Sequence, residues 1–173
     1  MLNILHHYFG TKLLNKIDPE ISHAIALCYL RLLNQFVKKK EIGASILKTQ
    51  IAGMEVPSPI GLAAGFDKNA EVFNATLSLG FGFVEVGTIT PDPQFGNPKP
   101  RLFRLLEEDA LVNKMGFNNK GMLYVSKIAR KPKLGIVGVN LGANAKSIDK
   151  ILDYTNVFEF LAHLFDYVTI NVS

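Results

Sequence analysis

The sequence predicts an α/β protein built on a parallel β-sheet, and three observations support this fold class. After residue 58, short apolar stretches typical of strands alternate with stretches of helical periodicity. A chain of 173 residues with 48% hydrophobic and 20% charged residues is long enough for one sizeable core. The four strand-like stretches lead to the polar residues Lys68, Thr88, Asn140 and Asn171. In a parallel sheet these residues lie together at the carboxyl ends of the strands.

Two helix-like segments precede the alternating region. Apolar residues recur at helical spacing over 2–14 and 21–36, and Asp18-Pro19-Glu20 is a typical helix start for the second segment. That second helix is apolar over an unusually wide face, so it needs cover on two sides. A hairpin packed on the core and a hairpin lying on a membrane surface both explain the pattern. No stretch approaches the ~20 apolar residues needed to span a bilayer.

The first half of the alternating region contains two predicted strands with a helix between them. The strands are expected at 60–63 and 83–87, and the helix at 71–79. A proline-rich stretch, 91–100, predicts a long structured loop. The residues that follow it, 101–113, fit a small antiparallel hairpin.

The second half repeats the same order. A helix is predicted at 121–129, a strand at 134–140, a helix from Tyr154 to Phe165 and a last strand at 168–172. Because helices separate the strands, the sheet is expected to be parallel with right-handed crossovers.

The bulk composition excludes several classes of function. The net charge of +4 comes mainly from scattered lysines and arginines, so we expect no nucleic-acid partner. The single cysteine, Cys28, cannot form an internal disulfide, and no His, Cys or carboxylate cluster has metal-ligand spacing. Glycine-rich dinucleotide and phosphate-loop motifs are also absent from the sequence.

The stretch from Gly61 to Asn69 is the strongest candidate for ligand binding. Its small residues Ala63, Ala64 and Gly65 allow a flat ring or a phosphate to approach the backbone closely, and Lys68 follows directly. A purely structural interpretation remains open: a buried strand, a helix capped by Asp67 or Asn69, and a solvated Lys68.

Asparagines dominate the remaining candidates. A carboxamide both donates and accepts hydrogen bonds, which suits a pyrimidine or a flavin ring. Asn118 and Asn119 also fit an ordinary turn. Asn140 and Asn171 end strands of buried character, where an unpaired carboxamide costs on the order of 1–3 kcal/mol, so we expect a ligand or a specific partner for each. The asparagines of the candidate site are Asn113, Asn118, Asn119, Asn140 and Asn171.

Together these residues form six motifs in order. The chain thereby resembles the quinone-dependent (class 2) dihydroorotate dehydrogenases, flavoproteins of pyrimidine synthesis. The motifs are Gly61-Leu62-Ala63-Ala64-Gly65-Phe66-Asp67-Lys68, Glu85-Val86-Gly87-Thr88-Ile89-Thr90-Pro91, Gly96-Asn97-Pro98-Lys99-Pro100-Arg101-Leu102-Phe103-Arg104, Asn113-Lys114-Met115-Gly116-Phe117-Asn118-Asn119, Gly138-Val139-Asn140-Leu141-Gly142 and Asn171-Val172-Ser173.

The resemblance implies the first half of a (β/α)8 TIM barrel preceded by an amino-terminal helical hairpin. Residues 1–40 would form a membrane-associating, quinone-tunnel segment, which favours the membrane-surface hairpin over the core hairpin. Residues 41–173 would form the amino-terminal half of an FMN-binding barrel. The implied reaction oxidises dihydroorotate to orotate with FMN and a membrane quinone. The implied location is peripheral, on the cytoplasmic side of the inner membrane if the source is bacterial.

The resemblance also assigns residues to ligands. The implied FMN contacts are Ala64, Gly65, Phe66, Asp67, Lys68, Thr88, Asn140 and Asn171. The implied dihydroorotate contacts are Lys68, Asn113, Lys114, Met115, Gly116, Phe117 and Asn171. His23 and Arg104 would lie near the quinone.

Two departures from the family pattern qualify these expectations. Lys114 stands where the family usually has arginine, which keeps the charge and loses the planar fork. The serine that acts as base in the family follows the position of Ser173, so no catalytic base is expected in this chain. The chain is therefore expected to be a truncated or split enzyme. An inactive fragment that serves as a membrane-surface or interaction module is the alternative, and the helical hairpin argues against the soluble dihydroorotate enzymes.

Overall fold

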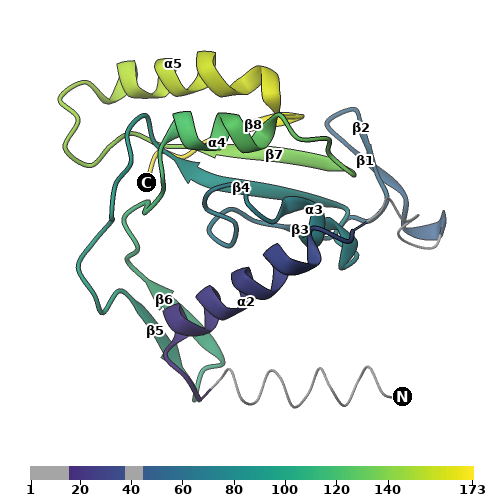
Figure 1. Ribbon diagram of the computed structural model, residues 1–173, viewed down its shortest axis with the longest axis horizontal. Coiled ribbons are helices and arrows are strands. Elements are labelled where there is room, and N and C mark those ends of the chain that lie inside the picture. Colours follow the sequence, from purple (N-terminus) through teal and green to yellow (C-terminus); the bar gives the residue numbers. More distant parts are fainter. Residues whose placement is uncertain (1–15, 38–44) are drawn as a thin grey trace.

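A parallel sheet forms the centre of the computed structural model, which describes residues 16–37 and 45–173. Its four strands lie side by side in chain order, and every pairing is parallel (Figure 1). The strands are β3 (Gly61–Leu62), β4 (Phe83–Ile89), β7 (Ile136–Leu141) and β8 (Tyr167–Ile170). The predicted α/β fold with a parallel sheet is confirmed.

Helices cover one face of this sheet. Helix α3 (Phe73–Ser78) connects β3 to β4, α4 (Met122–Ala129) precedes β7, and α5 (Lys150–Leu161) with the short η2 (Ala162–Leu164) precedes β8. Alternate strand residues such as Val84, Val86, Val137 and Val139 are fully buried and pack in one core with side chains of these helices. The core therefore lies between the sheet and its helices, as the period-2 pattern of the strands requires.

The opposite face of the sheet carries glycine, aromatic and polar residues. Near the amino ends of the strands, the rings of Phe83 and Tyr167 meet edge to face, with centroids 6.4 Å apart. A Cβ on Gly138 would lie 2.1 Å from the ring of Tyr167, so this glycine makes room for the ring. We call this face, opposite the helices, the inner face of the sheet. The two aromatic rings fill it near the amino ends of the strands, and polar side chains occupy it near the carboxyl ends.

Helix α2 (Pro19–Leu33) lies apart from the sheet and touches α3 and β5 (Figure 1). Asp18 caps it by accepting hydrogen bonds from the backbone N–H groups of Glu20 and Ile21, as predicted. Leu30 is buried against Val72 and Ala75. The predicted helix at 2–14 lies outside the described residues, so the hairpin as a whole stays a prediction.

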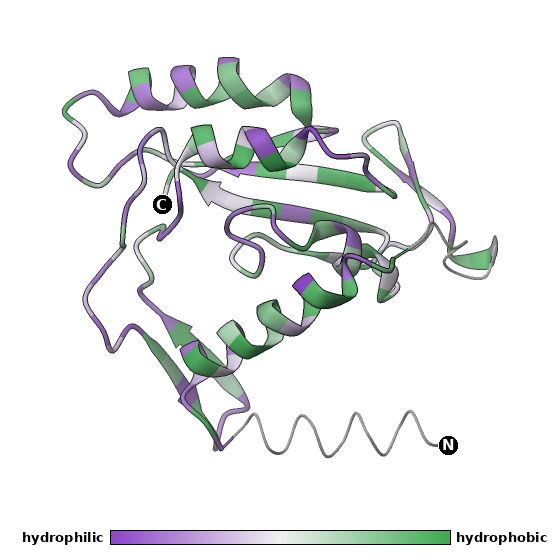
Figure 2. Cartoon of the chain, viewed as in Figure 1, coloured by the Kyte–Doolittle hydropathy of each residue, from purple (hydrophilic) through white to green (hydrophobic). Residues whose placement is uncertain are grey.

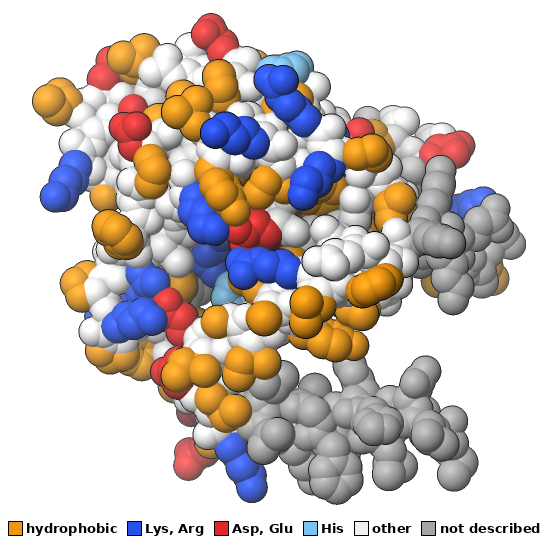
Figure 3. Space-filling view, in the orientation of Figure 1, with side chains coloured by type: hydrophobic (Ala, Val, Ile, Leu, Met, Phe, Trp, Pro, Cys, Tyr) orange, Lys and Arg blue, Asp and Glu red, His pale blue; other side chains and the backbone are white. Residues whose placement is uncertain are grey.

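The other side of α2 is apolar and exposed, and it is coloured green in Figure 2 and orange in Figure 3. Its exposed apolar side chains are Ile21, Ile25, Tyr29 and Leu32, and the exposed Phe36 follows just after the helix. Within 16–37 and 45–173, no helix is long and apolar enough to cross a membrane.

Several element boundaries differ from the sequence prediction. The stretch 48–58, in which no element is predicted, forms an antiparallel hairpin of β1 (Thr49–Ile51) and β2 (Met54–Val56) after the short η1 (Ser45–Leu47). Its turn residues Ala52 and Gly53 both have positive φ, the geometry of a tight hairpin turn.

Other elements are shorter than predicted or match the prediction. Helix α3 begins two residues later than predicted, because the Asp67 carboxylate accepts the N–H groups of Glu71 and Val72. Strand β8 ends at Ile170 rather than 172. The hairpin predicted at 101–113 is confirmed as β5 (Leu102–Leu105) and β6 (Ala110–Asn113).

Candidate functional site

A cavity of about 680 Å³ lies at the carboxyl ends of the four parallel strands. The sheet provides one wall, and α2 with the β5–β6 hairpin provides the other. Its lining residues are Pro19, His23, Ala63, Ala64, Gly65, Phe66, Lys68, Glu85, Gly87, Thr88, Leu102, Arg104, Leu111, Asn113, Met115, Gly116, Phe117, Asn118, Asn140, Asn171 and Ser173. Segments more than 140 residues apart in the sequence thus share one hollow.

Most of the predicted site residues line this cavity. They include seven of the residues expected at FMN, four further residues expected at dihydroorotate and the two residues expected near the quinone: Ala64, Gly65, Phe66, Lys68, Thr88, Asn140, Asn171, Asn113, Met115, Gly116, Phe117, Arg104 and His23. Two predicted residues do not line it. Asp67 is 1% exposed, and Lys114 lines a neighbouring hollow beside Asn113 and Tyr154.

The loop after β3 turns its backbone toward the cavity. Two hydrogen bonds hold it against β4: the N–H of Gly65 donates to the carbonyl of Gly87 at 2.8 Å, and the N–H of Gly87 donates to the carbonyl of Asp67 at 3.0 Å. Gly65 has φ +106°, and no atom lies within 4 Å of the position that a Cβ would take. The backbone is therefore open to a flat group at this point.

Lys68 places a cation at the edge of the cavity. Its Nζ donates to the carbonyl of Gly65 at 2.6 Å. Burial lowers the pKa of Lys68, Arg101 lowers it further, and Glu20 and Asp67 act in the opposite direction. A half-buried ammonium of this kind gains from an anionic or electron-rich ligand. Lys68 is therefore held by the loop at the edge of the cavity and is neither fully solvated nor fully buried.

Asp67 has a structural contact of its own. Its two carboxylate oxygens accept the N–H groups of Glu71 and Val72, each at 2.8 Å. Burial raises its pKa, while these hydrogen bonds act in the opposite direction. The side chain therefore holds the loop that leads into α3. It does not cap that helix, because the N-cap of α3 is Val72 and receives no side-chain hydrogen bond, so the predicted capping by Asp67 is wrong.

Asn140 and Asn171 find partners within the chain. Asn140 accepts a hydrogen bond from the hydroxyl of Thr88 at 2.7 Å and donates to Glu85 at 2.8 Å. Asn171 donates to the same hydroxyl at 3.3 Å and accepts from Ser173. The polar groups at the ends of β4, β7 and β8 are thus joined in one network.

Helix α2 contributes His23 to the cavity. Its Nε2 lies 2.7 Å from the carbonyl of Phe66, so the ring donates from this nitrogen, and the two rings meet edge to face. Burial lowers the pKa of His23, and Lys68 lowers it further. A neutral imidazole therefore links α2 to the loop that carries Lys68.

Salt bridges hold the start of α2 near the cavity. Glu20 pairs with Arg101, which is 7% exposed and also donates to the carbonyls of Phe95 and Asn97. Arg104 donates to the carbonyl of Ile17 at 3.0 Å. These contacts fix α2 against the β5–β6 hairpin.

Glu85 is the functional candidate that the sequence interpretation missed. It lies on β4 between the buried Val84 and Val86, so its side chain points to the inner face of the sheet. This alternation in the motif Val84-Glu85-Val86-Gly87 was available in the sequence and indicates an inward-facing carboxylate.

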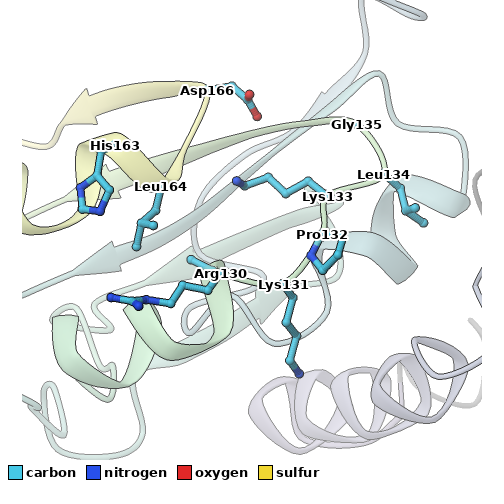
Figure 4. A pocket seen from close by; sticks show the side chains of 10 residues that line it. Arg130, Lys131, Pro132, Lys133, Leu134, Gly135, His163, Leu164 and Asp166 are labelled. Carbon is cyan, nitrogen blue, oxygen red and sulfur yellow. The ribbon is translucent and has the colours of Figure 1, made fainter.

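A second hollow, of about 550 Å³, lies at the amino ends of β7 and β8 (Figure 4). Its ionisable side chains are Arg130, Lys131, Lys133, His163 and Asp166. Helices α4 and η2 end here, and cations near the carboxyl end of a helix offset its dipole. The Asp166 carboxylate accepts the N–H of Val137 at 2.8 Å. These are structural roles, so the candidate site is the cavity at the carboxyl ends.

Four consecutive parallel strands, with polar residues at their carboxyl ends, define part of an α/β barrel with its site in the usual place. Two solved structures of dihydroorotate dehydrogenase from Eimeria tenella, one ligand-free and one in complex with ferulenol, share this fold. Each has a TM-score of 0.81 and 37% identity and covers 90% of this chain. The chain covers 44% of the ferulenol complex and 46% of the ligand-free structure.

The family model described as dihydroorotate dehydrogenase matches residues 46–173. The chain belongs to the dihydroorotate dehydrogenase family. It is 49% identical over 167 residues to the dihydroorotate dehydrogenase (quinone) of Rhodopseudomonas palustris strain HaA2. The same-named protein of Bartonella henselae is 48% identical over 166 residues. Each alignment covers 95% of this chain and 45% of the relative, so the chain spans about half the length of the curated relatives that it matches.

Proposed function

We propose that this chain forms one wall of an FMN and dihydroorotate site and serves the oxidation of dihydroorotate to orotate, with a membrane quinone as acceptor, in pyrimidine synthesis. One observation carries the proposal: a single cavity gathers thirteen of the fifteen residues that the family resemblance assigns to FMN, dihydroorotate and the quinone. Those residues come from the ends of β4, β7 and β8, the loops after β3 and β6, the β5–β6 hairpin and α2. The names of the relatives support the same activity.

The geometry of the cavity fits FMN. The open backbone at Gly65 offers a surface against which a flat ring can lie, since nothing lies within 4 Å of its missing Cβ. Ala64, Gly65, Thr88, Asn140 and Asn171 would hold the group with backbone and carboxamide contacts. FMN, when bound, supplies the acceptor for a hydride.

The remaining residues of the cavity would bind the substrate. The ammonium of Lys68 suits the carboxylate of dihydroorotate or the electron-rich edge of a flavin. Asn113 and Asn171 offer amide donors and acceptors to a pyrimidine ring. The segment 115–117 lines the cavity beside them and would shield the bound ring from water. We assign the role of base to none of the described residues.

We further propose that α2 attaches the protein peripherally to a membrane and that His23 and Arg104 face the quinone. The exposed apolar stripe of α2 supports this, because Ile21, Ile25, Tyr29 and Leu32 recur at spacings of three and four along one side. In vesicle flotation, Ile25→Asp is expected to lower the bound fraction. Ile151→Asp, on the exposed side of α5, is the matched control. Equal flotation of both variants would contradict this attachment.

The activity is tested in a chimera in which this chain replaces the matching part of the Rhodopseudomonas palustris relative. The chimera is expected to reduce a quinone analogue with dihydroorotate, and Lys68→Gln is expected to abolish most of that rate. Lys127→Gln, at the last turn of α4, is the control. A folded chimera with FMN bound and no turnover would refute the enzymatic proposal and favour the inactive-module alternative.

A further inference from the structure

Glu85 lies on the inner face of β4, below the polar strand ends. One carboxylate oxygen accepts a hydrogen bond from Nδ2 of Asn140, and the other accepts one from the hydroxyl of Thr169, each at 2.8 Å. Burial raises the pKa of Tyr167, and the neighbouring Glu85 raises it further, so this phenol stays protonated beside the carboxylate. The Glu85 carboxylate is therefore surrounded by hydrogen-bond donors.

The hydrogen bonds continue from Asn140 across the site. The hydroxyl of Thr88 donates to Oδ1 of Asn140 at 2.7 Å and accepts from Nδ2 of Asn171 at 3.3 Å. Each of these hydrogen bonds is donated in the direction of Glu85. At the far end, the N–H and hydroxyl of Ser173 donate to Oδ1 of Asn171 at 3.1 and 2.6 Å.

The Glu85 carboxylate determines which group donates and which accepts in each hydrogen bond of this series. An ionised carboxylate only accepts hydrogen bonds, so a flipped Asn140 would set two acceptor oxygens against each other. Asn140 must therefore turn its nitrogen to Glu85 and its oxygen to Thr88. The hydroxyl of Thr88 must then donate to Asn140, which leaves it able to accept from Asn171.

This direction fixes what the site offers to a ligand. Each carboxamide nitrogen carries a second N–H, and among residues 16–37 and 45–173 neither has an acceptor for it. Asn140 and Asn171 thus keep N–H donors free at the cavity. Donors of this kind match the ring carbonyls of a pyrimidine or of a flavin.

We propose that Glu85 is a positioning residue that orients Asn140, Thr88 and Asn171, so that both carboxamides present N–H donors to the carbonyl groups of the bound ring. The identity of the ring rests on the proposed function, whereas the orientation rests on the contacts of the chain alone.

Nuclear magnetic resonance of the full chain tests the orientation without a ligand. Glu85→Gln can donate as well as accept, which permits the flipped Asn140, so the side-chain amide signals of both Asn140 and Asn171 are expected to shift. Thr169→Val removes the other hydrogen bond to Glu85 and is expected to leave the Asn171 signals in place. A Glu85→Gln spectrum in which Asn171 is unchanged would overturn the proposal.

An FMN titration of the same variants separates this inference from the proposed function. The Kd of FMN is expected to rise about tenfold in Glu85→Gln and to stay within about twofold in Thr169→Val. A wild-type chain that binds no FMN would count against the proposed function, while the amide signals still decide the orientation. Wild-type affinity in Glu85→Gln would overturn the positioning role.

If Glu85→Gln does not fold, neutron diffraction of the wild-type chain can determine the orientation of the Asn140 carboxamide instead. Deuterons on the Asn140 atom that faces Glu85 would support the proposal. An oxygen at that place would overturn it.

Discussion

Removing the carboxylate of Glu71 is expected to loosen α2 from the rest of the chain. This side chain is 9% exposed and forms salt bridges with Arg31 of α2 and with Lys120, whose Nζ lies 2.7 Å away. The hydroxyl of Tyr124 donates to the same carboxylate at 2.6 Å. Glu71→Ala therefore removes three contacts, one of which holds the helix that carries His23.

The size of the effect follows from the exposure of the partners. Arg31 and Lys120 are 48% and 49% exposed, so both can regain water, and each pair contributes at most about 1 kcal/mol. The hydrogen bond from Tyr124 to a charged acceptor adds about 1 kcal/mol. The expected loss is about 2–3 kcal/mol, equivalent to a decrease in Tm of roughly 4–12 °C for a chain of this size.

Thermal and urea unfolding followed by circular dichroism measure this loss. Glu159→Ala, on the exposed side of α5, is the matched control and is expected to change stability by less than about 0.5 kcal/mol. Burial raises the pKa of Glu71, but the hydrogen bonds from Lys120, Tyr124 and Arg31 outweigh it and lower the pKa. Its contribution is therefore present above the ordinary carboxyl pKa and is lost in acid. A Glu71→Ala variant as stable as the control would refute the reasoning.

Three further predictions concern the elements around the site. Gly138→Ala places a Cβ 2.1 Å from the ring of Tyr167 and is expected to cost about 1–3 kcal/mol in urea unfolding, more than Gly135→Ala, whose Cβ would meet its nearest atom at 3.3 Å. Asp18→Ala removes the cap of α2 and is expected to cost about 1 kcal/mol; an unchanged midpoint would count against the cap. Burial lowers the pKa of His23, and Lys68 lowers it further, so the unfolded state binds the extra proton more readily than the folded state. The free energy of unfolding is therefore expected to decrease as the pH is lowered from about 7.5 to about 5.5. His23→Gln should remove that part of the pH dependence, and an unchanged profile would contradict the assignment.

The sequence was sufficient for the sheet because its strands are apolar and its breaks are marked by glycine and proline. In the motif Val84-Glu85-Val86-Gly87, apolar residues alternate with a charged residue and a glycine, so the sequence predicts which side chains lie on each face of the strand. The hairpin at 48–58 was missed, since its strands are only three residues long and all but two of their residues are exposed. Such strands carry little hydrophobic periodicity, and only the turn at Ala52 and Gly53 offered a signal.

The sequence predicted which residues form the candidate site better than it predicted the hydrogen bonds between them. Strand ends indicate which residues meet, so Lys68, Thr88 and Asn140 were predicted together. Their pairing depends on side-chain geometry across three strands, which a linear sequence does not specify. The family resemblance assigns Asp67 to FMN, whereas both of its oxygens accept backbone N–H groups of the following turn, a contact that the linear sequence does not specify.

An FMN titration of the full chain, followed by quenching of flavin fluorescence, tests the central claim most directly. The claim is that FMN lies over the open backbone at Gly65. Saturable quenching is expected in the wild-type chain and should be lost in Gly65→Val. Gly53→Val is the matched control, because Gly53 also has positive φ and no atom within 4 Å of its missing Cβ, and it should still bind. Equal binding by the two variants, or no saturable quenching in the wild-type chain, would contradict the account.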